Sequence, residues 1–372
     1  MKFNRYALSD LATIKYGKNQ KKVLSENGNI PIYGTGGLMG YATTALYDKP
    51  SVLIGRKGTI GKVKYVEHPF WTVDTLFYTI VNTDIVLPKY LYYVMSLIDL
   101  NNYNEGTTIP SLRTETLNRL EFDIPSLVEQ ETILSCLNPI DEKIALNNAI
   151  NNNLEQQAEA IFQSILSNAI TTVNLGEIAD VKGGKRLPKG VNLIDIPNVH
   201  PYIRVRNLNN VLFASLTPDY AYVDEETHKS ISRYIVSTGD VLLSIVGTIG
   251  LTAIVDSTLD KANLTENCVK VTNLKHITPE YLLLYLRSQL GKEAITKGTV
   301  GAVQQKLPIK NIQAIPIPVL SEKDKNTLFC TLDSIFAEIS SNVIQSAKLS
   351  SLRDTLLPRL MSGELNVSDI DL

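Results

Sequence analysis

The chain is an internal duplication, and this repeat restricts the possible folds more than any other feature. The stretch "LSDLATIKYGKN" (8–19) resembles "LGEIADVKGGKR" (175–186), and "SVLIGRKGTIG" (51–61) matches "DVLLSIVGTIG" (240–250). Three further pairs follow in the same order: "LPKYLYYVMSL" (87–97) with "TPEYLLLYLRS" (278–288), "GTTIPSL" (106–112) with "GTVGAVQ" (298–304), and "FDIPSLVEQ" (122–130) with "IPIPVLSEK" (315–323). The offset between the copies drifts only from 167 to 193 residues over these pairs and reaches 195 in the helical segments that follow them. We therefore expect two copies of one structural plan.

Each copy combines a mixed segment with a helical one. The mixed segments, 1–125 and 171–318, contain short β-like runs separated by turns rich in Gly, Pro and Asn. Helices are expected inside them at "YLYYVMSLI" and "YLLLYLRSQL". The segments 126–170 and 319–372 are expected to be helical spacers. The sequence therefore predicts an α+β protein with two mixed α/β domains, each followed by a long helix.

The two helical segments carry the same apolar seam when they are read in register at an offset of 195 residues. The 3,4 spacing is that of a coiled coil, with a polar position at Asn147 and at its counterpart Asn342. Such a polar residue costs stability but fixes the register of the pair. The first seam comprises Leu137, Ile140, Ile144, Asn147, Asn151, Leu154, Ala158, Ile161 and Ile165, and the second comprises Leu332, Ile335, Ile339, Asn342, Ser346, Leu349, Arg353, Leu356 and Leu360.

The first helix is predicted to begin at "NPID", with Asn138 as its cap and Pro139 in its first turn. Asp333 and Ser334 stand at the matching places of the second helix. A helix over 139–168 would be a rod of about 45 Å at 1.5 Å per residue. Two matched seams favour an antiparallel coiled coil of the two helices, and hence a pseudo-twofold internal duplication. The alternative is that each helix packs only on its own mixed domain.

Charge is unevenly distributed along a chain whose formal net charge is −2. Residues 1–125 hold 14 Lys and Arg against 11 Asp and Glu, and residues 171–318 hold 16 against 13. The helical segments are acidic, with 1 against 6 in 126–170 and 5 against 8 in 319–372. The combination of mildly basic mixed domains and acidic helices favours two nucleic-acid-binding domains on a protein-binding spacer. An ordinary fluctuation of surface charge is the alternative.

No pattern of catalytic or metal-binding residues is apparent. Cys136, Cys268 and Cys330 are far apart and the four histidines show no i, i+4 pair, so we expect no bound metal. The repeated "GTIG" fails as a phosphate-binding loop, because Arg56 stands where that loop needs glycine and Val63 where it needs Ser or Thr. The motifs of amino-methyltransferases and metal nucleases are also missing. We therefore expect a non-catalytic chain in which "GTIG" is a tight turn.

From the composition we expect a folded protein without a membrane span. Apolar residues make up 44% of the chain and charged residues 20%. No run approaches 18 apolar residues, and the N-terminus lacks the apolar core of a signal peptide, so a cytoplasmic location is expected.

Several motifs of the chain recur together in one known protein family. "LRDTLLPRLMSGEL" (352–365) and the helical stretch 124–165 resemble the C-terminal and central conserved regions of type I restriction–modification specificity subunits. "LSDLATIKYGK", "VLIGRKGTIG" and "YLYYVM" resemble landmarks of the target recognition domains in these subunits. The resemblance covers essentially the whole chain.

The resemblance implies that each mixed domain is a target recognition domain that reads one half of a split double-stranded DNA sequence. The two helices would set the distance between the half-sites and dock two methylation subunits, which bind S-adenosylmethionine. A restriction subunit, a motor and nuclease, would use ATP and Mg²⁺, while the specificity subunit binds no cofactor and catalyses nothing. The second helix carries "SEKDK" where the first has "VEQET", so the two docking sites are not expected to be fully equivalent.

Loop residues of both mixed domains are expected to contact DNA, with Lys and Arg on phosphates and Asn, Gln, Arg, Thr and Tyr on base edges. In the first domain they are Lys18, Tyr33, Thr35, Tyr41, Arg56, Lys57, Lys62, Thr107, Thr108 and Arg113. In the second domain they are Lys185, Arg186, Arg204, Arg206, Asn207, Lys297, Thr299, Gln304 and Gln305. For each of them a plain turn or a solvated surface is the alternative.

Two other functions remain open at this point. A fused DNA-modifying enzyme would bind S-adenosylmethionine without a partner subunit. A scaffold whose mixed domains bind protein would form a complex that is insensitive to salt and independent of DNA. A DNA-recognition subunit predicts instead a split motif that is methylated on opposite strands in its two halves.

Overall fold

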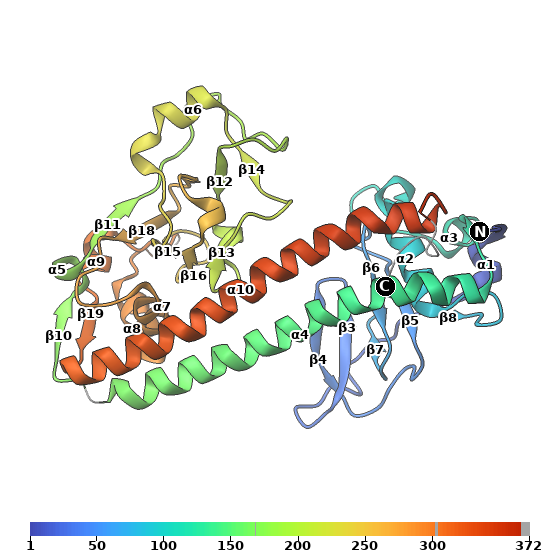
Figure 1. Cartoon of the computed structure of the whole chain (residues 1–372), viewed down its shortest axis with the longest axis horizontal. Helices are drawn as coiled ribbons and strands as arrows, with labels where there is room; N and C mark the ends of the chain where they lie inside the picture. The colour runs from blue at the N-terminus through green and yellow to red at the C-terminus, as the bar shows by residue number, and fades with distance from the viewer. Residues whose placement is uncertain (168, 302–303, 366–372) are drawn as a thin grey trace. The chain divides into compact units, whose positions relative to one another are not determined.

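The computed structural model describes residues 1–167, 169–301 and 304–365. The chain divides into two compact units, unit 1 (Met1–Leu146 with Gln345–Leu372) and unit 2 (Asn147–Ile344). Two helices of 40 residues, α4 (Leu127–Leu166) and α10 (Glu322–Met361), each contribute one part to unit 1 and the other part to unit 2 (Figure 1).

Unit 1 contains a four-stranded antiparallel sheet, a smaller three-stranded sheet and a two-stranded pairing near the long helices. The order in the larger sheet is β2 (Ala12–Tyr16), β8 (Leu76–Val81), β5 (Ser51–Gly55) and β6 (Val63–Val66). The smaller sheet has the order β4 (Gly37–Ala42), β3 (Ile30–Gly34) and β7 (Trp71–Thr72), in which β3 and β7 are parallel. The remaining elements are β1 (Asn4–Ala7), paired with β9 (Glu121–Ile124), and the short helices α1 (Leu8–Leu11), α2 (Pro88–Ser96), η1 (Leu100–Tyr103) and α3 (Thr114–Asn118).

Unit 2 follows the same plan with one more strand in its larger sheet. That sheet has the order β11 (Asp180–Gly183), β18 (Cys268–Thr272), β15 (Val241–Ser244), β16 (Thr252–Val255) and β13 (Phe213–Ala214). The smaller sheet has the order β14 (Ala221–Tyr222), β12 (Pro201–Ile203) and β17 (Asn263–Leu264), with β12 and β17 parallel. The remaining elements are β10 (Thr171–Asn174), paired with β19 (Pro316–Val319), and α5 (Leu175–Ile178), η2 (Val205–Leu208), α6 (Glu225–Ser230), η3 (Ser232–Tyr234), η4 (Ser257–Leu259), α7 (Pro279–Arg287), α8 (Gln289–Gly298) and α9 (Ile309–Gln313).

The helices predicted inside the mixed segments are confirmed as α2 and α7. Each begins with a proline at its first position, where the missing N–H costs no hydrogen bond. In unit 1 one core joins α2 to the larger sheet and to the long helices, through buried side chains such as Tyr90, Phe77, Leu137 and Leu360. In unit 2 the matching core includes Tyr281, and its ring packs edge-to-face on Phe162 of α4 at a centroid distance of 5.2 Å.

The predicted start of the long helices is wrong by about three turns. Helix α4 begins at Leu127, where Ser126 and Glu129 cap each other, and Pro139 lies inside it. An interior proline costs about 3 kcal/mol, but the turns before it bury Ile133, Leu134 and Leu137, and this burial offsets that cost.

The second helix begins correspondingly early, at Glu322 after Ser321, whose hydroxyl accepts a hydrogen bond from the Asp324 amide. Asp333 and Ser334, which matched the predicted start, therefore lie inside it. A helix of 40 residues is about 60 Å long, rather than the 45 Å expected.

The predicted antiparallel pairing of the long helices is confirmed within each unit. In unit 2 the Asn342 side chain donates to Asn151 Oδ1 at 2.9 Å, and the Asn147 side chain donates to the Asn342 carbonyl at 3.4 Å. In unit 1 Arg353 Nη1 lies 3.0 Å from Asp141 Oδ1. The residue numbers of the partners increase along one helix as they decrease along the other, as an antiparallel pair requires. All eighteen seam side chains are buried or half-buried.

The buried asparagine cluster of the seam is expected to stabilise unit 2. Replacing Asn342 by alanine removes its donor to Asn151 in a buried setting, which costs about 1–3 kcal/mol. In urea, the Asn342→Ala variant should unfold at a lower denaturant concentration than the natural chain. Asn152→Ala, at an exposed position of α4, is the control and should move the transition little. Equal midpoints for both variants would contradict the prediction.

Candidate nucleic-acid interface

A glycine–lysine turn follows β2 in unit 1. The Gly17 amide donates to the Leu76 carbonyl at 3.0 Å, and the Lys18 amide donates to the Thr72 carbonyl at 2.8 Å. A Cβ atom on Gly17 would lie 2.0 Å from the Val73 carbonyl oxygen, so only glycine fits this approach of two backbone segments. The turn therefore fixes the backbone that carries the exposed Lys18 side chain.

The same turn recurs after β11 in unit 2. The Gly184 amide donates to the Cys268 carbonyl at 2.9 Å, and the Lys185 amide donates to the Leu264 carbonyl at 2.8 Å. A Cβ atom on Gly184 would lie 2.0 Å from the Thr265 carbonyl oxygen. Lys185 therefore holds in unit 2 the position that Lys18 holds in unit 1.

The two "GTIG" segments are tight turns, as predicted. Gly58 and Gly247, the first glycine of each copy, have φ angles of 88° and 79°, a region that favours glycine. In unit 2 the hydroxyl of Ser244 donates to the Thr248 carbonyl at 2.6 Å and closes the turn. Gly55 stands at the position of this serine in unit 1, and there the backbone of the turn comes close to Gly55.

Each "GTIG" turn is joined to the loop that follows the next helices of its unit. In unit 1 the Leu112 amide donates to the Arg56 carbonyl at 3.0 Å, and the Gly58 amide donates to the Pro110 carbonyl at 2.9 Å. In unit 2 the Leu307 amide donates to the carbonyl of Ile245, at the position of Arg56, at 2.9 Å. Loops that are distant in sequence are thereby held side by side in both units.

Three of the ten residues predicted for the first domain, Tyr33, Thr35 and Lys62, line a small pocket. It has a volume of about 120 Å³, and its lining includes Tyr33, Thr35, Thr59, Lys62 and Lys64. The Lys64 ammonium lies 3.8 Å from the centre of the Tyr33 ring, a cation–π contact, and burial lowers the pKa of this lysine. No acidic side chain is among the described residues that line the pocket.

Arginines of the second domain gather along a wider groove of about 420 Å³, which Arg186, Arg204 and Arg206 line together with Tyr202. Burial lowers the pKa of Arg204, and the neighbouring Arg206 lowers it further. Glu266 also lines the groove, and its carboxylate lies 2.7 Å from Arg186. A guanidinium already engaged by a carboxylate must exchange that partner before it can bind a phosphate or a base.

Several other predicted residues have structural partners of their own. The side chain of Asn207 accepts from the Arg204 amide at 2.9 Å, and that of Thr299 donates to the Ile295 carbonyl at 2.8 Å. Arg113 forms an ion pair of 3.1 Å with Glu105. Arg56 Nη1 donates to the Asp74 carbonyl at 2.8 Å. The remaining predicted residues have exposed side chains, namely Tyr41, Lys57, Thr107, Thr108, Lys297, Gln304 and Gln305. DNA contact by these residues stays a prediction.

The sequence did not reveal that the segment after β3 corresponds to the segment after β12. The Val73 amide donates to the Tyr33 carbonyl at 3.0 Å, and in unit 2 the Thr265 amide donates to the Ile203 carbonyl at 3.1 Å. Tyr33 and Ile203 are therefore equivalent. After them, unit 1 continues into the β3–β4 hairpin, and unit 2 continues through Arg204 into η2. The two segments share no sequence pattern, so only the hydrogen bonds reveal their relation.

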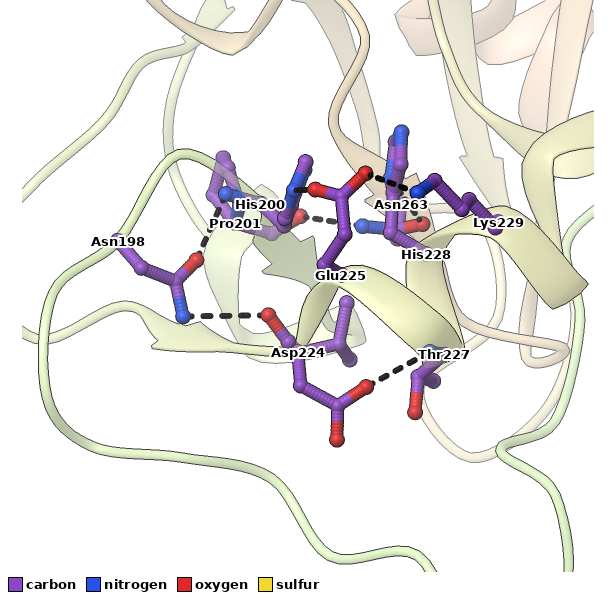
Figure 2. A network of polar contacts seen from close by, with 10 residues as sticks. Asn198, His200, Pro201, Asp224, Glu225, Thr227, His228, Lys229 and Asn263 are labelled. Atoms are coloured by element: carbon purple, nitrogen blue, oxygen red, sulfur yellow. Dashed lines mark hydrogen bonds and ion pairs between the residues drawn. The ribbon is translucent and has the colours of Figure 1, made fainter.

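A polar network in unit 2 brings together two histidines that the sequence leaves 28 positions apart (Figure 2). The rings of His200 and His228 stack with centroids 4.0 Å apart. His200 Nε2 lies 2.5 Å from Glu225, which also pairs with Lys229 at 3.1 Å, and His228 contacts Asn263 at 3.2 Å. Within the described part of the chain, no group of three His, Cys, Asp or Glu side chains is placed to hold a metal. The network ties α6 to β12 and β17.

Comparison with known proteins gives a consistent result. The family model described as "Type I restriction modification DNA specificity domain" matches residues 2–156 and again 169–348. The chain is 23% identical to the specificity subunit of the type I restriction enzyme MjaIX of Methanocaldococcus jannaschii, over 87% of this chain and 80% of that one. It is also 23% identical to the HindI specificity subunit of Haemophilus influenzae, over 82% of this chain and 84% of that one.

Among solved structures, the S subunit of a type I restriction–modification system from M. genitalium has a similar fold. The TM-score is 0.59 at 17% identity, covering 97% of this chain and 96% of that chain. Among the helices of the described residues, none is both long and apolar enough to cross a membrane.

Proposed function

Because the chain belongs to the type I restriction–modification DNA specificity family, we propose that it is the DNA-recognition subunit of a type I restriction–modification complex. Each mixed domain reads one half of a bipartite double-stranded DNA target. The long helices set the distance between the two half-sites and dock two methylation subunits.

The observation that carries this proposal is the same loop framework in both units. In each unit, backbone hydrogen bonds hold a glycine–lysine turn, a "GTIG" turn and the loop beside it in equivalent positions. The framework bears Lys18, Arg56 and Lys62 in unit 1 and Lys185 and Arg186 in unit 2. Cations on fixed loops can position a duplex by its phosphates, and the variable side chains between them can then read bases. Two such frameworks in one chain suit a target in two parts.

The chemistry is assigned to partner subunits in this proposal. The methylation subunits bind S-adenosylmethionine, and the restriction subunits use ATP and Mg²⁺, whereas this chain binds no cofactor and catalyses no reaction. Support comes from the curated relatives, which are named specificity subunits. A complex of these subunits works on DNA in the cytoplasm.

Methylome sequencing of cells that carry the chain with its partner subunits tests the proposal. The expected result is one split motif, with methylated adenines or cytosines on opposite strands in its two halves. The same cells without the gene for this chain provide the control and should lack the motif. A continuous motif, or no motif while the methylation subunits are active, would contradict the proposal.

The matched lysines of the glycine–lysine turns are expected to bind phosphates. Removing one lysine–phosphate interaction reduces the slope of log K against log salt by about 0.9. We expect Lys18→Gln and Lys185→Gln to lower this slope by similar amounts, as measured by DNA binding of the assembled complex between low and moderate salt. Lys348→Gln, at an exposed position of α10, is the control and should leave the slope unchanged.

This measurement also separates DNA recognition from a protein-binding scaffold. If neither turn lysine alters the slope, phosphate binding by the turns is excluded. A complex that forms without DNA and does not respond to salt would favour the scaffold.

A further inference from the structure

The tip of the β3–β4 hairpin in unit 1 exposes large apolar side chains. Leu38 and Met39 are 54% and 56% exposed, and Tyr41 further along β4 is 45% exposed. Four glycines in this hairpin, at 34, 36, 37 and 40, let the ribbon turn sharply, and Gly37 and Gly40 have positive φ angles. Burial of such side chains against a partner is favourable, because it removes apolar surface from water.

The surroundings of the tip indicate that the partner is a polyanion. Thr35 and Gly37 of the hairpin line the same pocket as Lys62 and Lys64, and no carboxylate is among its described lining residues. Arg56 and Lys57 precede the "GTIG" turn that also lines this pocket through Thr59. An apolar tip beside a cluster of cationic side chains suits a DNA duplex. The phosphates would contact the cationic side chains while the tip enters a groove.

The shape and chemistry of the tip select one feature of that groove. The major groove of B-DNA admits a two-stranded β-ribbon, and β3 and β4 form such a ribbon (Figure 1). Leucine and methionine side chains cannot read the hydrogen-bonding edges of bases. The apolar group on a major-groove edge is the 5-methyl group of thymine.

The equivalent segment of unit 2 has the opposite character. After Ile203, the counterpart of Tyr33, it presents Arg204 and Arg206, which line the groove with Arg186. Guanidinium groups favour guanine O6 and N7. The two frameworks are therefore alike, but the side chains at this position differ in the base they suit.

We propose that Leu38 and Met39 contact thymine 5-methyl groups in the half-site read by the first mixed domain. The inference rests on the proposed function, since it assigns a base feature to one of the two readers. The half-site of the first domain consequently contains at least one A·T pair at which the methyl group contributes to affinity.

Replacing thymine by deoxyuridine, which lacks only the 5-methyl group, tests the proposed interaction. The complete complex is titrated with duplexes that carry the bipartite target and one such replacement at a time. A buried methyl group is worth about a fourfold change in affinity. We expect this decrease at one or more positions of the first half-site for the natural chain. For the Leu38→Ala/Met39→Ala variant, affinity is already reduced and the same replacements should have no further effect.

Controls distinguish this interaction from less specific causes. Leu97→Ala, an exposed apolar position in the same unit, should keep the full deoxyuridine effect. A Leu38→Asn/Met39→Gln variant, similar in size but polar, should lose it, and circular dichroism of each variant verifies that the fold is retained.

Three results would overturn the inference while leaving the proposed function intact: a first half-site without thymine, a target indifferent to deoxyuridine, or a methyl effect that persists in both tip variants. Loss of assembly with the methylation subunits, without any deoxyuridine effect, would identify the tip as a protein-binding surface instead. Failure of the natural complex to recognise any bipartite target would contradict the proposed function itself.

Discussion

A Gly17→Ala substitution is expected to unfold the mixed domain of unit 1 or to lower its stability by about 3–5 kcal/mol. The added Cβ atom would lie 2.0 Å from the Val73 carbonyl oxygen and 2.7 Å from that of Thr72. Both obstacles are backbone atoms, so no side chain can rotate to make room. Thermal unfolding and limited proteolysis of the purified chain would reveal the destabilisation, and in cells the methylated motif should disappear.

Gly36→Ala is the matched control, because a Cβ atom at Gly36 would meet no atom within 4 Å and its φ angle is not positive. Its stability should stay within about 0.5 kcal/mol of the natural chain. Gly184→Ala should repeat the effect of Gly17→Ala in unit 2, where Thr265 provides the obstacle. Stability of Gly17→Ala equal to that of Gly36→Ala would contradict the expected clash.

These two glycines illustrate what an internal repeat makes predictable. The sequence aligns "KYGK" with "KGGK", and the structure gives both glycines the same amide hydrogen bond and the same close approach. Repetition of a glycine at one place in two otherwise divergent copies signals a backbone requirement rather than a side-chain contact. The helices α2 and α7, and the pairing of the long helices, were predictable for a similar reason, since apolar periodicity fixes which face is buried.

The start of the long helices was not predictable from local rules. "NPID" carries a good cap and a proline at the right place, but "SLVE" at 126–129 carries a capping box as well. Local preferences of similar size compete at the two places. Burial of Ile133, Leu134 and Leu137 in the core of unit 1 decides between them, and that burial depends on the tertiary fold.

Arg353 shows a different limit of the sequence. At a seam position it interrupts the apolar pattern, and its counterpart in the first helix is Ala158. In the structure it pairs with Asp141 of α4, which also accepts a hydrogen bond from the Tyr93 hydroxyl of α2. The seam in unit 1 therefore includes an ion pair anchored to the mixed domain. Only knowledge of the partner distinguishes such a residue from a defect in the repeat.

The loops that form the candidate site were predictable from the sequence, but the contacts between them were not. The sequence marked both basic turns, and hydrogen bonds then joined "GTIG" to its neighbouring loop in each unit. It could not indicate that Glu266 pairs with Arg186, or that the β3–β4 hairpin corresponds to the segment at Arg204. Contacts between loops depend on the lengths of the loops and on their turns, and these differ most between the two copies.

Lengthening the paired helices is expected to change the distance between half-sites without changing the bases read. One heptad inserted after Asn147 in α4, with a second at the paired place after Asn342 in α10, preserves the seam because the hydrophobic repeat has that period. It lengthens the helix pair by about 10.5 Å, which corresponds to about three base pairs at 3.4 Å each. Methylome sequencing should then show both half-sites unchanged, with a gap longer by that amount.

Rotation of the DNA makes this test sharper. Three added base pairs turn the second half-site by roughly a third of a helical turn of about 10 base pairs, whereas a coiled coil with a pitch of about 150 Å turns far less over the same length. Three heptads add about 31 Å, or about nine base pairs, and bring the half-sites back close to the same face of the duplex. We therefore expect weaker methylation with one heptad in each helix than with three. An insertion of two residues in each helix turns the rest of the seam to the opposite face of the helix, because an α-helix has about 3.6 residues per turn, and should abolish methylation. A changed half-site with an unchanged gap would show that the helices do not set the distance.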